Sequence, residues 1–315
     1  MIVVISHPED VHGTEVVARL HRRRRDALMF DTGAFPSHIG LTVRQPGDGR
    51  WAARARVDDV DADLTATRVV WWRRPRPLRL HEDIAAASAD RMFAYNECHA
   101  AITGLWSALD AHWVNDPERD LVASRKVVQL KRASELGMRV PRTCITNDPV
   151  EAQAFVEGEG AERTIYKSFL GSEDAWRETR VLRPDEQSLL ENVRYAPVIF
   201  QEFIPAVIDL RVTVVGGDLF PAAIRSQETR YPHDFRMDLE AARMEPHLLP
   251  DEVSLRLLAL MASFGLVYGA IDLRLTPEGE YVFLEVNPAG QWLFVELRTG
   301  QPITDALVDY LIAHD

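Results

Sequence analysis

The stretch that most constrains the fold lies near the end of the chain, at 281–290 (YVFLEVNPAG). Residues 281–286 are mostly aromatic, β-branched or otherwise apolar, which predicts a buried strand. Glu285 lies inside this run and Asn287 follows it. Being two residues apart, their side chains face the same side of a strand. Because an unpaired buried carboxylate is costly, this pattern indicates a cation or a hydrogen-bonded partner, and two oxygen donors on one face suit Mg²⁺.

A second acid-bearing strand is predicted just upstream, at 268–275, where Asp272 is the one acid. The intervening segment 276–280 (TPEGE) is a turn signal, so the two strands should form a hairpin that brings Asp272 beside Glu285 and Asn287. The alternative is a strand pair whose acids meet solvent or an arginine. Three converging oxygen donors favour the metal site over that alternative.

Composition and charge exclude several classes of protein. The 315 residues are 27% charged and 46% hydrophobic, as expected for a globular chain with two or three subdomains. The net charge of −12 argues against non-specific nucleic-acid binding. Cys98 and Cys144 form neither a disulfide framework nor a metal-ligand spacing. With no signal peptide and no stretch able to cross a membrane, we expect a cytoplasmic protein without membrane or nucleic-acid partners.

The first 115 residues are predicted to form a small α/β unit. A strand at 2–5, a helix at 11–24 and a strand at 27–30 make a β-α-β arrangement, and 81–111 predicts a long helix. The segment 68–77 (RVVWWRRPRP) runs from a strand into a basic, proline-rich loop. Its Trp and Arg residues fit either a peptide or anion site or ordinary packing of arginine on tryptophan, and both interpretations stay open.

Two lysines in the middle of the chain occupy positions suited to anions. Lys126 falls in the first turn of a predicted helix, where free backbone N–H groups also point. For this residue alone, a surface lysine is the simpler interpretation. Lys167 lies among apolar residues in a strand predicted at 163–169, so its ammonium must reach an anion or an acid.

A strand that breaks into a linker is predicted at 196–205 (APVIFQEFIP), and such a linker offers backbone C=O and N–H groups to a flat heterocycle. Beyond it, strands at 210–215 and 219–225 are separated by two glycines. We expect an antiparallel hairpin in which Arg211 and Arg225 meet. Two arginines without adjacent acids suggest an anion between them.

The order and spacing of these residues resemble those of ATP-grasp ligases, including the branch that contains the ribosomal-protein glutamate ligases. A more specific resemblance, over nearly the whole chain, is to the graspetide (microviridin-type) peptide maturases. The stretches that carry it are 70–75, 113–117, 143–149 and 287–292. The resemblance implies an α/β (α+β) ATP-grasp fold. Its parts would be a pre-ATP-grasp βαβ domain at 1–115, a central ATP-grasp domain with a lid at 116–200, and a C-terminal ATP-grasp domain at 201–315.

The resemblance also implies a nucleotide site. Two lysines would hold the ATP phosphates, a hinge would bind adenine largely through backbone groups, and one acid would bind the ribose. These residues are Lys126, Lys167, Gln201, Glu202, Phe203, Ile204 and Asp209. The loop after Lys167 departs from the family pattern, because Gly171 is its only glycine, and the charged segment 173–194 is expected to contain the lid and part of a leader-peptide surface.

The implied metal and catalytic groups complete the site. Asp272, Glu285 and Asn287 would hold two Mg²⁺ ions that bridge the β- and γ-phosphates. Arginines would stabilise the transferred phosphate and the tetrahedral oxyanion. The arginines expected to do so are Arg211, Arg225 and Arg236.

The family reaction follows from these parts. ATP would activate a side-chain carboxylate of a ribosomally made precursor peptide, consisting of leader and core, as an acyl phosphate. A hydroxyl or amine of the same peptide would then close an ω-ester or ω-amide macrocycle. Two other functions remain as alternatives: an intermolecular ligase that adds an amino acid such as glutamate, and a non-catalytic peptide-binding module. The apolar stripe at 303–313 indicates core or a dimer face, and we expect a homodimer.

Overall fold

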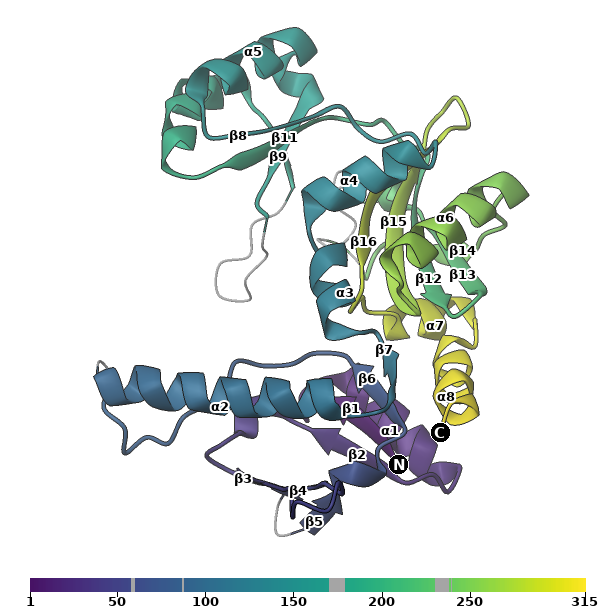
Figure 1. Ribbon diagram of the computed structural model, residues 1–315. Coiled ribbons are helices and arrows are strands. Elements are labelled where there is room, and N and C mark those ends of the chain that lie inside the picture. Colours follow the sequence, from purple (N-terminus) through teal and green to yellow (C-terminus); the bar gives the residue numbers. More distant parts are fainter. Residues whose placement is uncertain (58–59, 87, 170–178, 230–237, 239) are drawn as a thin grey trace.

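The computed structural model describes residues 1–57, 60–86, 88–169, 179–229, 238 and 240–315. It has a mixed α/β fold in three parts, with a five-stranded sheet between an N-terminal α/β region and a small α/β region built around a four-stranded sheet (Figure 1). None of the described helices combines the length and apolarity that a membrane span requires.

The N-terminal region is built on a parallel sheet of order β2-β1-β6-β7. Its strands are β1 (Ile2–Ile5), β2 (Ala27–Phe30), β6 (Val69–Trp72) and β7 (His112–Val114). Helix α1 (Val11–Arg22) connects β1 to β2, so the predicted β-α-β unit is confirmed. A separate antiparallel sheet, absent from the prediction, consists of β3 (Ile39–Arg44), β4 (Ala52–Val57) and β5 (Val60–Asp63).

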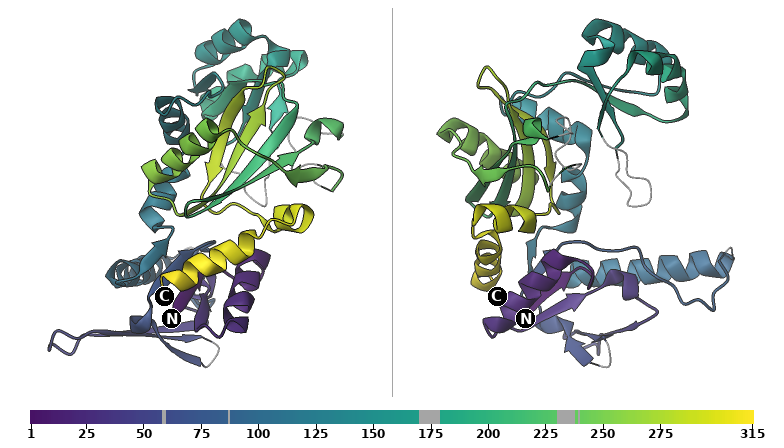
Figure 2. Two further views of the ribbon diagram at one scale, coloured as in Figure 1. Left: turned by 90° about the vertical axis from the view of Figure 1, so that its right-hand side faces the viewer. Right: turned by 180° about the vertical axis from the view of Figure 1, so that it is seen from behind.

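Helix α2 (Ala89–Ala108) is shorter than the predicted 81–111. It begins late because the side chain of Ser88 accepts a hydrogen bond from the N–H of Arg91 and caps the first turn. The C-terminal half of α2 packs on one face of the parallel sheet through Ile102, Leu105 and Trp106. The opposite face is covered by α1 and by α8 (Ile303–Ala313), which lies beside α1 although it comes from the other end of the chain (Figure 2).

The small sheet in the middle of the chain has the order β10-β9-β11-β8. Its strands are β8 (Thr143–Thr146), β9 (Thr164–Lys167), β10 (Arg180–Val181) and β11 (Val198–Glu202). Helix α5 (Pro149–Glu159) packs on it through Ala152 and Val156. This helix starts where the sequence favours a start, with Asp148 as N-cap and Pro149 in the first turn.

The five-stranded antiparallel sheet has the order β14-β13-β12-β15-β16. Its strands are β12 (Ile208–Val215), β13 (Asp218–Ile224), β14 (Met244–Pro246), β15 (Tyr268–Leu275) and β16 (Tyr281–Asn287). One face packs against helices α3 (Pro117–Ala123), α4 (Lys126–Glu135) and α6 (Asp251–Phe264). Helix α7 (Leu293–Thr299) follows β16 and leads to α8. The predicted hairpin of β15 and β16 is confirmed.

Candidate active site

The site lies on the face of the five-stranded sheet that is turned away from α6. Along β12, Leu210 and Val212 point into the apolar core, whereas the intervening Asp209 and Arg211 alternate to the other face. All of β12 is buried, so these two charged side chains must find partners within the protein.

The two acids of the predicted metal site lie directly opposite each other. In the β15–β16 register Asp272 pairs with Glu285, while the next residue, Leu273, pairs with Phe283. Leu284 is therefore the extra residue of a β-bulge. The bulge has a chemical consequence, because residues 283 and 285 would otherwise face the same side. It keeps the Phe283 ring in the core and turns Glu285 toward Asp272 on the polar face.

Both carboxylates have cationic partners from neighbouring elements. Arg211 Nη1 donates to Asp272 Oδ1 at 2.7 Å and to Oδ2 at 2.8 Å. Lys126, the first residue of α4, forms an ion pair with Glu285 Oε2. The third predicted ligand, Asn287, ends β16, and its Oδ1 accepts a hydrogen bond from the N–H of Ala289 at 3.0 Å.

The donor set fits a hard divalent ion. It offers two carboxylates on adjacent strands and an amide oxygen two residues further along β16. Lys126 and Arg211 lie against these two carboxylates, so positive charge is stabilised at this position. Within the described ranges no cluster of three or more His, Cys, Asp or Glu residues is found.

Asp209 lies between two hydrogen-bonding partners on the same face. It is 3% exposed and accepts a hydrogen bond from Arg274 Nε at 2.8 Å and another from the hydroxyl of Ser226. Arg274 also donates through Nη1 to the carbonyl of Ile204 at 2.8 Å, which ties Asp209 to the linker after β11. Sequence reasoning missed Arg274, although a basic residue two positions from Asp272 on a strand could have indicated it.

The linker predicted to bind a heterocycle follows β11. Gln201 is buried and donates through Nε2 to Thr143 Oγ1 at 2.9 Å. The backbone N–H groups of Glu202 and Phe203 bond the carbonyls of Arg142 and Arg163. The carboxylate of Glu202 accepts a hydrogen bond from Arg142 Nε at 2.9 Å.

The two candidate phosphate-binding lysines belong to different parts of the molecule. Lys126 begins α4 beside the five-stranded sheet, and its N-cap residue, Arg125, supplies no side-chain hydrogen bond to the first turn. Lys167 ends β9 in the four-stranded sheet and pairs with Ile199 in the strand register.

The hairpin of β12 and β13 does not bring Arg211 and Arg225 together, so that prediction is wrong. The two-glycine turn sets a register in which Arg211 lies opposite Ala222, and Arg225 follows the end of β13. Each arginine has an acid partner: Arg211 pairs with Asp272, and Arg225 Nη2 contacts Glu245 Oε1 at 2.7 Å. Arg236 and Gly171 lie outside the described residues, as do residues 173–178 of the segment expected to contain the lid.

The sheet, the facing acids and the linker together define an ATP-grasp protein, and the family models agree. The model of the MvdD pre-ATP grasp domain matches residues 1–120, and that of the RimK-like ATP-grasp domain matches residues 120–311. The chain therefore belongs to the RimK-like ATP-grasp family, with an MvdD-type pre-ATP-grasp domain before it. The resemblance and the fold inferred from the sequence are confirmed. A search of curated proteins gave no match.

Several solved structures resemble the chain over its whole length. The macrocyclase MdnC of Microcystis aeruginosa MRC, solved with the precursor peptide MdnA, is 28% identical; the match covers 99% of this chain and 98% of MdnC, with a TM-score of 0.87. A RiPP-associated ATP-grasp ligase of Chryseobacterium gregarium, solved with ADP and a leader and core peptide, is 27% identical (100% and 97% covered, TM-score 0.89). The ATP-grasp ligase PsnB, solved with a minimal precursor, Mg and ADP, is 27% identical (99% and 97% covered, TM-score 0.76).

Proposed function

We propose that this protein is an ATP-dependent macrocyclase of a ribosomally made precursor peptide. It activates a side-chain carboxylate as an acyl phosphate, which a hydroxyl or amine of the same peptide attacks to form an ω-ester or ω-amide. The observation that carries the proposal is the pair of facing carboxylates, Asp272 and Glu285, on the polar face of the sheet. Whole-length similarity to MdnC and to the Chryseobacterium ligase supports a precursor with leader and core as the partner.

The metal part of the proposal assigns Mg²⁺ to Asp272, Glu285 and Asn287, with two ions as in the family. Bound Mg²⁺ neutralises phosphate charge while a carboxylate attacks the γ-phosphoryl group. PsnB was solved with Mg and ADP, which supports the choice of ion and nucleotide. In this site Lys126 would exchange its contact with Glu285 for a phosphate oxygen, helped by the backbone N–H groups at the start of α4.

The nucleotide part assigns adenine to the linker after β11. With the N–H groups of Glu202 and Phe203 and the carbonyl of Ile204 engaged within the protein, we assign the base to the Glu202 carbonyl and the Ile204 N–H. Lys126 and Lys167 are proposed to hold the phosphates. Gln201 is proposed to line the nucleotide site, and Asp209 is proposed to bind the ribose.

The catalytic part assigns charge stabilisation to arginines. Arg211 lies beside Asp272 and would be directed at the acyl phosphate once a metal ion takes over that carboxylate. Arg225 and Arg236 are proposed for the oxyanion that forms when the hydroxyl or amine attacks. We also propose the three-domain division at 1–115, 116–200 and 201–315, a homodimer, and a cytoplasmic location. Sedimentation velocity tests the homodimer.

The experiment that tests the function uses a peptide encoded beside this protein's gene. Incubation with ATP and Mg²⁺ should give ADP, and mass spectrometry should show loss of one water per crosslink. A mass gain on adding glutamate would instead select the intermolecular ligase. Peptide binding in a calorimeter without ADP release would select the non-catalytic module, and either result would overturn the macrocyclase proposal.

A further inference from the structure

The loop that follows β16, residues 288–291, is held by side chains at each of its carbonyl groups. We call this segment the metal-strand loop, because β16 carries Glu285 and Asn287. The contacts are Asn115 Nδ2 to Pro288 O (3.4 Å), Arg73 Nη1 to Ala289 O, Arg73 Nη1 (2.9 Å) and Tyr268 Oη (2.7 Å) to Gly290 O, and Arg211 Nη2 to Gln291 O (3.4 Å). Two successive carbonyls are therefore held by one guanidinium, that of Arg73.

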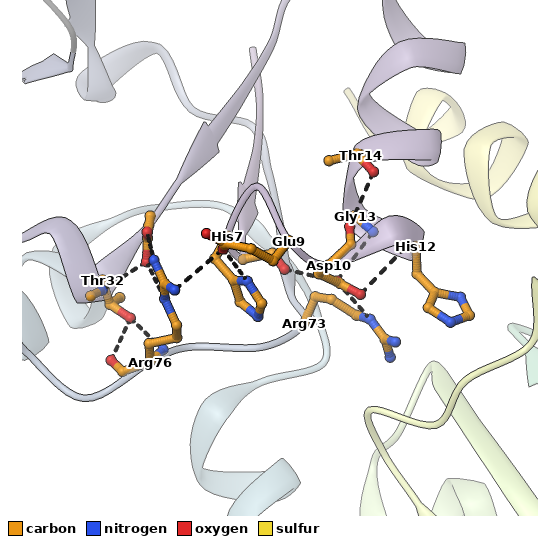
Figure 3. A network of polar contacts seen from close by, with 12 residues as sticks. His7, Glu9, Asp10, His12, Gly13, Thr14, Thr32, Arg73 and Arg76 are labelled. Atoms are coloured by element: carbon orange, nitrogen blue, oxygen red, sulfur yellow. Dashed lines mark hydrogen bonds and ion pairs between the residues drawn. The ribbon is translucent and has the colours of Figure 1, made fainter. Parts of the chain in front are cut away.

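Arg73 belongs to the N-terminal region and not to the sheet that carries the metal-strand loop. It follows β6 of the N-terminal sheet, is 1% exposed, and lies 5.2 Å from the centre of the Trp292 ring. Its Nε donates to Asp10 Oδ2 at 3.3 Å (Figure 3). A buried guanidinium is costly, and the Asp10 carboxylate offsets only part of that cost. Of the remaining donors, Nη1 is directed at the metal-strand loop, whereas Nη2 is buried without a hydrogen-bond partner among the described residues.

Asp10 is itself fixed by the fold. It caps α1 by accepting hydrogen bonds from the N–H groups of His12 and Gly13, and it accepts a third from Ser6 Oγ at 2.8 Å. Burial would raise the pKa of Asp10, but the charge of Arg73 and the Ser6 hydrogen bond hold it below its usual value. Arg73 is thus anchored at one end by a charged partner that belongs to the N-terminal region.

The contact of Arg73 with Ala289 leads directly to a proposed metal ligand. The carbonyl of Ala289 accepts from Arg73, and its N–H donates to Asn287 Oδ1 at 3.0 Å. The loop also has little room to move, because a Cβ atom on Gly290 would lie 2.3 Å from the Cβ of Ala270, the strand partner of Asn287. The position of Ala289 therefore sets the orientation of the Asn287 amide.

We propose that Arg73 is a positioning residue for the reaction: from the N-terminal domain it fixes the metal-strand loop and thereby orients Asn287 at the metal site. The inference rests on the proposed function, because it takes Glu285 and Asn287 as metal ligands. It gives Arg73, from the segment 68–77, a role that the sequence left open, and it makes the N-terminal domain part of the metal site without contact to the ion.

The test is a Mn²⁺ titration of the full-length protein with ADP, followed by electron paramagnetic resonance, which needs no turnover. Arg73→Lys keeps the positive charge, but its single nitrogen cannot at once take the place of Nε at Asp10 and of Nη1 at the two carbonyls. We expect Mn²⁺ to bind about 10-fold more weakly, the usual effect of losing an outer partner of a ligand. In the matched control, Arg74→Lys, the affinity should stay at the wild-type value. In assays of ADP formation, the Mg²⁺ concentration for half-maximal rate should rise in Arg73→Lys while kcat at saturating Mg²⁺ stays near the wild-type value.

Two further variants separate the possible failures. If Glu285→Gln binds Mn²⁺ as well as the wild type, the proposed metal site fails, and with it the basis of this inference. If Glu285→Gln weakens Mn²⁺ binding and folded Arg73→Lys does not, only the role of Arg73 is overturned. Should Arg73→Lys not fold, Gly290→Ala displaces the loop by contact with Ala270 and leaves the N-terminal domain intact. Unchanged Mn²⁺ affinity in that variant would equally overturn the inference.

Discussion

At the scale of single residues, the site is defined by carboxylates that are paired with cations. Glu285 is held by Lys126 and Asp272 by Arg211, so each acid has a cation before any metal ion is bound. Such pairs avoid the cost of an isolated buried charge. They also place the lysine and arginine within reach of the phosphates that would accompany the metal. One set of contacts therefore serves both stability and the proposed chemistry.

The first prediction concerns Glu285. Glu285→Gln keeps the volume but removes the ligand charge, so ADP formation should fall below detection in a coupled assay. Because the Glu285 side chain is 21% exposed, the free energy of unfolding should change by no more than about 1 kcal/mol. Glu278→Gln, in the exposed turn of the same hairpin, is the control and should keep full activity. Normal ADP formation by Glu285→Gln would remove the metal assignment.

The second prediction separates activation from acyl transfer. Arg225→Ala should slow crosslink formation by about 10²–10³-fold, the usual effect of losing an oxyanion partner, while ADP is still formed. Arg243 contacts the same acid, Glu245, at 3.4 Å and is 70% exposed, so Arg243→Ala is a matched control that should leave the rate unchanged. Both rates come from one time course that follows ADP and peptide mass. A loss confined to ATP affinity would assign Arg225 to the nucleotide.

The third prediction concerns pH and His12, which is 4% exposed and packs 4.4 Å from the Trp292 ring centre. Burial, followed by the charge of Arg73, lowers the pKa of His12 from 6.5 to about 3. The folded protein therefore binds fewer protons than the unfolded chain between pH 3 and 6.5, so stability is lost as the pH falls through this window. Between pH 7 and 5 the loss from His12 alone should be about 2 kcal/mol.

Urea unfolding at these two pH values checks the prediction for His12. In His12→Gln the side chain no longer titrates, so the difference in unfolding free energy between pH 7 and 5 should shrink by about 2 kcal/mol. The comparison uses this difference and not the absolute stability, which the smaller, polar side chain also changes. Parallel pH dependences of wild type and variant would show that folding does not lower the pKa of His12.

At the scale of elements, β16 is an edge strand, and a side chain supplies hydrogen-bond partners to its outward-facing backbone groups. Gln129 of α4 is 1% exposed; its Nε2 donates to the carbonyl of Val286 at 2.8 Å, and its Oε1 accepts from the N–H of Val286 at 3.1 Å. The Gln129 amide thus makes the two hydrogen bonds with Val286 that a further strand would otherwise make. It protects the edge between Glu285 and Asn287 and fixes α4, and with it Lys126, against the sheet.

The fourth prediction follows from that contact. Gln129→Met preserves the shape but leaves the buried N–H and C=O of Val286 without their partner, so the free energy of unfolding should fall by about 2–3 kcal/mol. Hydrogen exchange at the Val286 amide should accelerate relative to amides in β12. Gln153→Met, on α5, is the control with little expected effect. Unchanged exchange at Val286 would mean that the side-chain amide does not stabilise the strand.

The elements also show how far sequence reasoning reaches. Runs of apolar and β-branched residues predicted β15 and β16, the turn signal between them predicted their hairpin, and the two-residue spacing predicted that Glu285 and Asn287 share one face. It could not reveal that Leu284 is a bulge, because one extra residue leaves the composition of the strand unchanged. The register of the β12–β13 hairpin depends on turn geometry, which local composition does not specify. The predicted contact between Arg211 and Arg225 is therefore wrong.

Contacts between residues that are distant in sequence cannot be predicted from such local patterns. Arg73 and Ala289 are separated by 216 positions, and Gln129 and Val286 by 157. Nothing local to either residue specifies its partner, because the contact exists only once the domains have packed. The roles of the site residues themselves stay predictions, including that of Arg236.

At the scale of the whole molecule, the N-terminal and C-terminal parts share one apolar core. Its buried residues come from the N-terminal sheet, from α1, and from the segment after β16 that includes Trp292 and α8. Around it, Arg19 of α1 pairs with Glu296 at 3.0 Å and with Asp305 at 3.0 Å. The two ends of the chain are therefore expected to unfold together and not as separate domains.

The last prediction tests this shared core through Trp292, which is fully buried, donates from Nε1 to Thr304 Oγ1 at 2.8 Å and packs against Trp71 and Tyr268. Trp292→Ala should lower the stability by about 3–5 kcal/mol. Because the lost contacts span both parts, calorimetry should show the N-terminal region melting separately from the remainder. Trp51→Ala, within the N-terminal core alone, should lower the melting temperature without splitting that transition. A single transition in Trp292→Ala would show that Trp292 is not required to couple the two parts, which the rest of the shared core and the contacts of Arg19 and Arg73 would then hold together.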